Sequence, residues 1–214
     1  MQKYCMLIRN DKIYIKSNRS RKVVEYSLNN TIIYPNVPLY SAIFKDEKII
    51  KDLRIFIRDN VDNNNTFMQR MSGKKLFLLT PDDVTVVTDI ERYAFYEFGK
   101  TIFGVKDIII GGECSFVAPF EVNNYICISK TCRMMILTYI KDRKTVKQKF
   151  IENRDYTNEE IHTFIRELYV GTGSIPKVYL NGVGLLKYSD IGVVIDSVEL
   201  INTFGNIVEP LKIK

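Results

Sequence analysis

Tryptophan is absent from this 214-residue sequence, and histidine occurs once, as His162. The four cysteines, at positions 5, 114, 127 and 132, include no pair with the Cys-x-x-Cys spacing of a zinc or redox motif. This composition argues against a zinc site, a disulfide framework and a catalytic pairing of histidine with serine or cysteine. We therefore expect the cysteines to be buried thiols in a reducing compartment.

Long apolar runs are also missing, and none approaches the roughly 20 residues that an α-helix needs to cross a bilayer. The N-terminal stretch MQKYCMLIRNDKIYIK is interrupted by charge and does not resemble a signal peptide. We expect a cytoplasmic protein, with a peripheral position at the inner face of the membrane as the alternative. The hydrophobic fraction of 46% suits a globular chain of one large domain or two small ones.

The net charge of +6 and the isoelectric point near 9.0 are mildly basic. Basic residues gather at Arg19–Lys22 and Lys141–Lys149. Such clusters attract nucleic acid or an anionic membrane surface, although solvated surface charge is the more ordinary explanation. No RNA- or DNA-binding motif accompanies them, so a nucleic-acid partner is not expected.

Strand-like segments dominate the first part of the chain. Tyr4–Ile8 and Lys12–Ser17 predict a hairpin with a tight turn at Asn10-Asp11. Short apolar runs predict further strands at Lys22–Tyr26, Thr31–Tyr34, Ser41–Phe44, Lys48–Ile50 and Leu53–Ile57.

The segment from Lys75 to Phe120 carries the most information. Leu76–Leu79 is an apolar strand, and Thr88 or Asp89 caps a helix that runs to Gly99. A second strand, Val105–Ile110, ends at two glycines. A strand–helix–strand order implies a parallel pair with a right-handed crossover.

The second part repeats this layout without repeating the sequence. The predicted strands are Tyr125–Ser129, Arg133–Ile140, Thr145–Glu152, Lys177–Leu180 and Ile191–Ile195. Thr157 and Glu160 form a capping box for a helix that runs to about Val170. A short helix is predicted to begin at Ser197 and to end at Gly205.

The order of the segment from Lys75 to Phe120 resembles the central unit of the bacterial actin-like proteins, the MreB family above all. The resemblance implies an α/β fold of two RNase H-like subdomains, a trimmed actin-like ATPase core with its covering insert subdomains reduced or absent. It assigns residues 1–122 to a first subdomain and 123–195 to a second. Residues 196–214 are expected to return to the first.

The resemblance also implies an ATP site, whose two phosphate loops this chain does not keep. In the family an Asp-x-Gly-Thr loop follows the first strand, whereas here Arg9 stands in place of the acid and no glycine follows. Asp11 is the candidate for a displaced acid, with an ordinary turn residue as the alternative. The second loop corresponds to the turn from Lys130 to Arg133, which has no glycine and no carboxylate. The two cations of this turn, Lys130 and Arg133, either contact an anion or are solvated surface charges.

Two further positions correspond to functional loops of the family. Glu113, after Gly111-Gly112, resembles the carboxylate that orients the attacking water and is the catalytic candidate. Asn181, Gly182 and Gly184 resemble the loop that holds adenosine and are cofactor-binding candidates. The alternative for the glycines is a turn that needs positive φ. No metal-binding residues are assigned.

The missing phosphate motifs favour a pseudo-ATPase, because phosphoryl transfer depends almost entirely on positioning and electrostatics. The first hypothesis is a non-catalytic MreB-like protein without a cofactor, acting through protein–protein contacts or self-association in cytoskeletal or cell-shape assembly. The second is a minimal ATP-binding protein that holds ATP and Mg²⁺ in a reduced site. The third is a basic adaptor for a membrane surface or a nucleic acid.

Four aromatic residues crowd the predicted helix before Gly99, namely Tyr93, Phe95, Tyr96 and Phe98. They cannot all face one core. The sequence therefore predicts either that part of the helix meets a partner or that the helix is packed between two layers.

Overall fold

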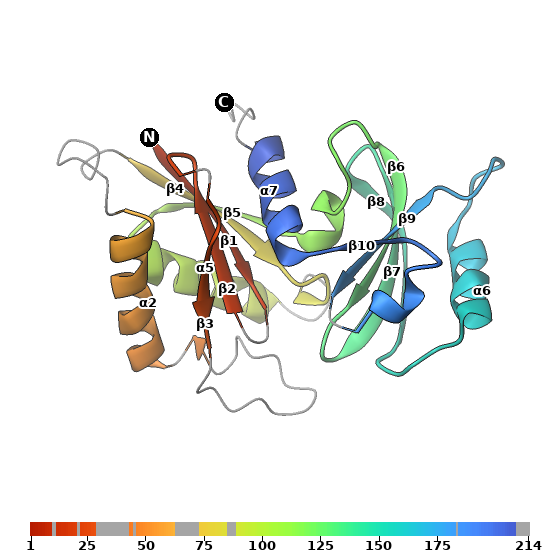
Figure 1. Cartoon of the computed structure of the whole chain (residues 1–214), viewed down its shortest axis with the longest axis horizontal. Helices are drawn as coiled ribbons and strands as arrows, with labels where there is room; N and C mark the ends of the chain where they lie inside the picture. Colours follow the sequence, from red (N-terminus) through yellow and green to blue (C-terminus); the bar gives the residue numbers. More distant parts are fainter. Residues whose placement is uncertain are drawn as a thin grey trace.

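The computed structural model describes residues 1–9, 12–20, 22–28, 43–44, 46–62, 73–84, 89–182 and 184–208, with backbone alone for 206–208. Two five-stranded sheets lie side by side, and helices cover their outer faces and fill the layer between them (Figure 1). Within the described residues, no helix is long and apolar enough to span a bilayer.

The first sheet has the strand order β3-β2-β1-β4-β5. β1 pairs with β2 in antiparallel fashion and with β4 in parallel, and β5 runs parallel to β4. Its strands are β1 (Gln2–Ile8), β2 (Lys12–Ser17), β3 (Val24–Ser27), β4 (Lys74–Thr80) and β5 (Asp107–Gly112). Two helices, α2 (Glu47–Asn60) and α5 (Asp89–Phe103), pack on its outer face.

The second sheet has the order β10-β9-β6-β7-β8. When the strands of each sheet are numbered by their order along the chain, and the second sheet is taken from β8 to β10, both sheets have the order 3-2-1-4-5. In both sheets the fourth strand runs parallel to the first. The strands are β6 (Asn124–Lys130), β7 (Met134–Lys141), β8 (Lys144–Glu152), β9 (Lys177–Gly182) and β10 (Val193–Ile195). The α/β fold with two similar halves is as the sequence predicted.

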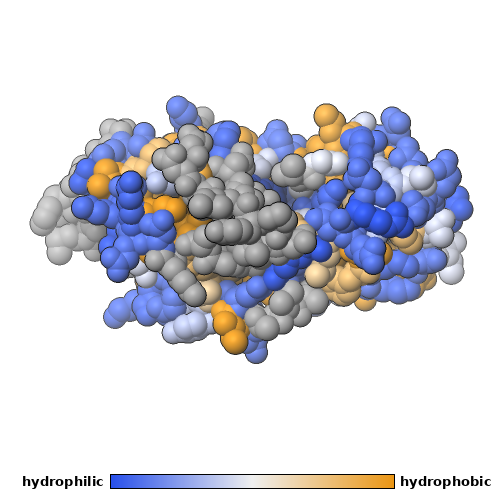
Figure 2. Space-filling view, turned by 90° about the horizontal axis from the view of Figure 1, so that it is seen from below, coloured by the Kyte–Doolittle hydropathy of each residue, from blue (hydrophilic) through white to orange (hydrophobic). Residues whose placement is uncertain are grey.

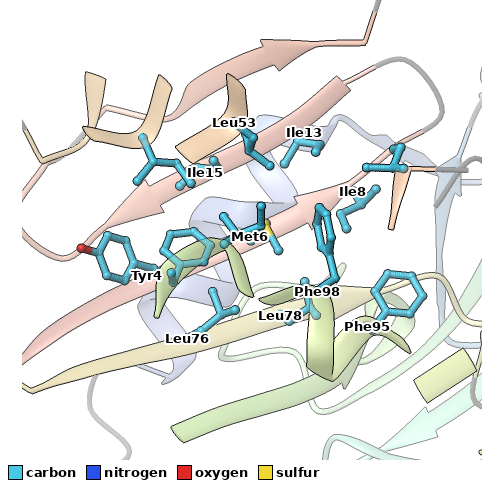
Figure 3. Close-up of a cluster of buried hydrophobic side chains, with 14 of the residues drawn as sticks. Tyr4, Met6, Ile8, Ile13, Ile15, Leu53, Leu76, Leu78, Phe95 and Phe98 are labelled. Carbon is cyan, nitrogen blue, oxygen red and sulfur yellow. The ribbon is translucent and has the colours of Figure 1, made fainter. Parts of the chain in front are cut away.

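Three apolar clusters hold the layers together. The first lies between the first sheet and its two helices, and Figure 3 shows its side chains pointing from the strands toward them. The second lies between the two sheets and includes α7 (Ser197–Val208) and the 3-10 helix η1 (Glu113–Phe116). The third lies between the second sheet and α6 (Asn158–Leu168), together with the 3-10 helix η2 (Leu186–Tyr188).

The last helix, α7, packs on β1 and β2 of the first sheet. Asp196 precedes it, and its carboxylate accepts a hydrogen bond from the backbone N–H of Glu199 at 2.7 Å. The cap is therefore one residue earlier than the predicted Ser197. The prediction that Gly205 ends the helix is wrong, because the helix continues to Val208. A division into two subdomains at residue 122 stays a prediction.

The strands predicted at Lys48–Ile50 and Leu53–Ile57 are wrong, because both segments belong to α2. Asp46 caps this helix and accepts from the backbone N–H of Lys48 at 2.9 Å. Leu53 and Ile57, which lie four residues apart, are both buried against the first sheet. Short apolar runs fit either structure, and it is this four-residue spacing that marks the helix.

Other predicted elements lie partly or wholly outside the described residues. These are the turn at Asn10-Asp11, the strand at Thr31–Tyr34 and the first half of Ser41–Phe44, of which residues 43 and 44 form no strand. By contrast, the capping box of Thr157 and Glu160 is confirmed, with both reciprocal hydrogen bonds formed.

Helix α5 divides its aromatic residues between the core and the surface. Phe95 and Phe98 are buried and pack against Phe44. The Tyr96 hydroxyl donates to the backbone carbonyl of Lys106 at 3.2 Å. Tyr93 is 64% exposed. Among the described residues visible in Figure 2, hydrophilic side chains dominate and apolar ones form separate groups.

Candidate functional site

The two sheets meet at the carboxyl ends of their parallel strands. In the first sheet, β1, β4 and β5 lead into Arg9, Asp82 and Glu113. In the second, β6 and β9 lead into the turns after Lys130 and Asn181. Ligand sites of open α/β sheets lie at this end of the strands. We call the set Arg9, Asp82, Asp83, Glu113, Ser129, Arg133 and Asn181 the polar junction.

Arg9 is the centre of this polar junction. Its Nη1 lies 2.6 Å from Glu113 Oε2, its Nη2 donates to Asn181 Oδ1 at 2.7 Å, and its Nε donates to Ser197 Oγ at 3.2 Å. Asn181 Nδ2 donates in turn to the same Glu113 oxygen at 2.6 Å. The guanidinium thus ties β1 to η1, β9 and the start of α7.

The Arg9–Glu113 ion pair is almost entirely buried, with side-chain exposures of 14% and 2%. Such a pair contributes little net stability relative to apolar residues, but removing one partner leaves an uncompensated buried charge. The second carboxylate oxygen, Glu113 Oε1, is buried without a hydrogen-bond partner among the described residues. The arrangement fixes how the two halves sit more than it adds to their attraction.

Asp82 provides a second link between the halves. Its Oδ1 accepts from the backbone N–H of Cys114 at 2.8 Å, and its Oδ2 accepts a short hydrogen bond from the Ser129 hydroxyl of β6. Burial, and next the negative charge of Glu113, raise the pKa of Asp82 to about 6, against the opposing effect of these hydrogen bonds. Burial likewise raises the pKa of the neighbouring Cys114 and Cys127 thiols, which therefore stay protonated.

Arg133 provides the third link, from the β6–β7 turn of the second half. Its Nε lies 2.7 Å from Asp83 Oδ2, and its two terminal nitrogens lie 2.8 and 3.1 Å from the carboxylate oxygens of Glu91. The fork geometry of guanidinium suits such bidentate pairing. Arg133 is thus neither an anion contact nor a solvated turn charge, because it pairs with the carboxylates of the first half.

Gly182 and Gly184 have positive φ angles of 128° and 79°. A Cβ on Gly182 would lie 2.4 Å from the backbone carbonyl oxygen of Lys130, so this glycine permits the close approach of two chain segments. At Gly184 the nearest atom to such a Cβ is Lys130 Nζ, at 4.0 Å. The turn therefore has a structural reason for its glycines.

The structure brings some of the predicted site residues together. Glu113 and Asn181 are hydrogen-bonded to one another, and Gly182 follows directly, whereas Asp11 lies outside the described residues. Sequence reasoning did not select Asp82, Asp83, Ser129 or Ser197. One feature of the sequence could have pointed to Asp82 and Asp83, because these two adjacent carboxylates directly follow the apolar strand β4 and Pro81.

Comparison with solved structures identifies the architecture. EutJ from Carboxydothermus hydrogenoformans, an ethanolamine utilization protein, matches 96% of this chain and 88% of its own, with a TM-score of 0.57 and 10% identity. The apo ParM protein of psk41 matches 97% and 98%, with a TM-score of 0.57 and 9% identity. The chain has the actin-like ATPase fold.

A third actin-like match, AlfA from the B. subtilis plasmid pLS32 in a filament structure, covers 98% of this chain and 99% of its own, with a TM-score of 0.52 and 10% identity. MreB5 of Spiroplasma citri bound to ADP matches 78% of this chain at a TM-score of 0.46 and 15% identity, and the chain spans only 56% of its length. No protein-family model and no curated protein matches the sequence. At these identities the likeness concerns the fold alone.

The carboxylates of the polar junction all accept hydrogen bonds from the protein itself. Asp82 is bonded by Ser129 and Cys114, Asp83 by Arg133, and Glu113 by Arg9 and Asn181. In the described part of the chain, no group of three or more His, Cys, Asp or Glu side chains is placed to hold a metal ion. What the arrangement does is join the two halves through fixed, directional contacts.

Proposed function

We propose that this chain is a non-catalytic actin-like protein that acts through protein–protein contacts. The observation that carries the proposal is Arg9, whose guanidinium bonds to Glu113, Asn181 and Ser197 at once. The resemblance to the actin-like family implies an acid at this position in a chain that hydrolyses ATP. Here a cation that belongs to the protein stands there, and it joins the same elements that a nucleotide site would use.

Three features of the junction argue against a site for ATP with Mg²⁺. Glu113 Oε2 already accepts from Arg9 and Asn181, which leaves only the buried Oε1 to meet a metal ion or a water molecule. The Lys130–Arg133 turn has no glycine whose backbone amides would cradle a phosphate. Of the two cations of this turn, Arg133 is held by Asp83 and Glu91, and Lys130 Nζ lies 3.5 Å from Asp155 Oδ1.

Self-association, or binding to a cytoskeletal or cell-shape partner, is the role that this proposal favours. AlfA, which shares the fold, is seen in a filament. A core whose halves are fixed by internal ion pairs presents an unchanging surface, which suits binding a partner without nucleotide-driven movement. Binding to a membrane surface or to a nucleic acid would instead support the basic adaptor as the alternative role.

The test is a thermal unfolding series of the purified chain with increasing Mg-ATP, paired with sedimentation velocity over a range of protein concentrations. We expect no shift in Tm with Mg-ATP, because a ligand stabilises a fold only by binding it. We also expect sedimentation that changes with protein concentration. A saturable rise in Tm would overturn the proposal and support the minimal ATP-binding alternative.

A pair of variants shows where any nucleotide binds. Glu113→Gln changes a buried carboxylate in the junction, whereas Glu25→Gln changes one on β3 that pairs with Lys12. If Mg-ATP raises the Tm of the unmodified protein and Glu113→Gln alone removes that rise, the junction is a nucleotide site. A chain that stays monomeric and ignores ATP contradicts self-association and directs the search to a second protein.

A further inference from the structure

The four outer strands of the two sheets differ greatly in length. β8 has nine residues, whereas β5 has six, β3 has four and β10 has three. Most residues of β8 are exposed and none is fully buried. An outer strand of this length presents unpaired backbone N–H and C=O groups on which another strand can add.

The charge around β8 is strongly one-sided. Between positions 141 and 149 lie the basic residues Lys141, Arg143, Lys144, Lys147 and Lys149, and the single acid is Asp142. Arg143 is committed to the protein, because it donates to the backbone carbonyls of Ser115, Ala118 and Pro119. Lys141, Lys144 and Lys147 are exposed, so this edge carries a positive potential toward solvent.

Lysines on an outer strand commonly prevent another strand from pairing. Here the two in the middle of β8 are held against α6 instead. Lys147 Nζ donates to the backbone carbonyl of Glu167 at 2.8 Å, and Lys149 pairs with the Glu167 carboxylate and lies over the Phe164 ring at 4.8 Å. These contacts draw both side chains over one face of the sheet. In the described part of the chain β8 pairs with no strand other than β7, and at its end the Glu152 carbonyl accepts from the Arg154 N–H and the Tyr156 hydroxyl.

The opposite face of β8 is partly apolar. Gln148 donates to Thr138 of β7 at 3.2 Å, and Phe150, two residues on, is 44% exposed. The register between β7 and β8 shifts at Val146, which is 49% exposed. Residues 147–152 are therefore the regularly paired part of this outer strand. An added strand would therefore meet an open backbone, an exposed aromatic ring and nearby positive charge.

We propose that residues 147–152 of β8 bind an extended, acidic segment of a partner protein as an additional strand. The inference rests on the proposed role in protein contact and names the chemistry of the partner. In such strand addition the backbone hydrogen bonds supply affinity and the side chains select the sequence. The exposed Lys144 favours acidic residues in the partner segment, and the exposed Phe150 favours an apolar residue among them.

The probe is a labelled synthetic peptide of alternating glutamate and valine, about ten residues long, at the upper end of ordinary strand length. Its control has the same sequence with a backbone N-methyl group at every residue, which keeps the charge and removes the N–H donors from both edges of the peptide. We expect fluorescence anisotropy to show binding that weakens at least about tenfold on methylation, because several backbone hydrogen bonds are lost. Amide hydrogen exchange should slow at residues 147–152 when the unmethylated peptide binds.

Matched variants locate the site. Lys144→Glu and Phe150→Ser should each weaken peptide binding several-fold, whereas Lys51→Glu, an equal charge change on exposed α2, should not. Absence of peptide binding, or equal binding of both peptides, overturns the proposal. So does preferential binding to phosphatidylserine vesicles or to an oligonucleotide, which would mean a general polyanion surface. None of these outcomes bears on the Mg-ATP titration, so the two proposals fail separately.

Discussion

The two halves of the molecule are joined by two regions of opposite character. One is the polar junction at the carboxyl ends of the parallel strands. The other is the apolar layer between the sheets, which includes Phe77 of the first sheet, Tyr125 and Tyr179 of the second, and Leu200 and Phe204 of α7. The layer removes apolar surface from water, a driving force that is large but has no preferred direction. The junction consists of hydrogen bonds and ion pairs that form in one geometry only.

The difference indicates how this core holds its shape through its own side chains. The layer supplies most of the attraction between the halves, since burying large apolar side chains stabilises by about 2 kcal/mol each. The junction selects one relative orientation, because Arg9, Asp82 and Arg133 each bond across from one half to the other or to α7. Substitutions in the two regions should therefore have distinguishable effects.

The largest effect should come from the apolar layer. Phe204 is 1% exposed and packs edge-on against Phe116 and Phe77, with ring centroids 4.6 and 6.2 Å away. Phe204→Ala leaves a cavity and should lower the free energy of unfolding by about 3–5 kcal/mol, measured by urea denaturation. Phe120→Ala, at a residue that is 68% exposed, is the control and should change it by less than about 0.5 kcal/mol. Equal effects would mean that α7 does not hold the layer together.

Many of the elements that form the apolar layer, and the two apolar clusters under the outer helices, could be predicted from local sequence. The strands of the second half, the helix with the Thr157 capping box, and the repeated layout all emerge from apolar periodicity and end signals. Helix α2 does not, because its apolar residues fall in short runs that also fit strands, and Asp46 was not recognised as its cap. At Gly205 a glycine usually ends a helix, but packing of α7 on the first sheet outweighs a cost of about 1 kcal/mol.

A smaller effect is expected from the centre of the polar junction. Arg9→Met keeps the side-chain volume and removes the cation, which leaves Glu113 buried with an uncompensated charge. We expect a loss of about 3 kcal/mol in the free energy of unfolding, measured in the same urea experiment. The double variant Arg9→Met with Glu113→Gln removes both charges and keeps an oxygen for Asn181 to bond.

That double variant should be more stable than Arg9→Met alone, since only the single change leaves an unpaired charge. Losses that simply add would show that the two side chains act independently. Small-angle scattering of the unmodified protein and of Arg9→Met adds a second readout, because the junction fixes the relative orientation of the two halves. An unchanged scattering profile in Arg9→Met would mean that the apolar layer alone sets the arrangement of the halves.

The junction itself was much less accessible from sequence than the fold. Its members come from positions as far apart as Arg9 and Asn181, and they meet only because both sheets place their parallel carboxyl ends together. Glu113 and Asn181 were selected by resemblance to loops with another use, and the structure shows them bonded to each other. Arg9 was noted as a departure from the family pattern, and nothing in the local sequence indicated which side chains it would bond.

The last effect is spread over a range of pH and concerns the acidity of Asp82, whose pKa is raised from 3.8 to about 6 by burial and by Glu113. Between these values the folded protein holds a proton that the unfolded chain has released. The contribution of Asp82 is therefore most favourable at low pH and is lost as the pH rises through about 6. Asp82→Asn carries no charge at any pH and retains an oxygen for the Cys114 N–H.

Relative to the unmodified protein, Asp82→Asn should therefore gain stability as the pH rises from about 4 to 7, with a slope of at most about 1.4 kcal/mol per pH unit. Urea denaturation at several pH values measures this difference and cancels the titrations that both proteins share. Asp52→Asn, on the exposed face of α2, reports the effect of losing any one carboxylate. In a Glu113→Gln background the transition should move to lower pH, because the negative charge that helps to raise the pKa of Asp82 is gone. A difference that stays constant with pH would mean that Asp82 is better solvated than its burial implies, and that the polar junction is open to water where the apolar layer is not.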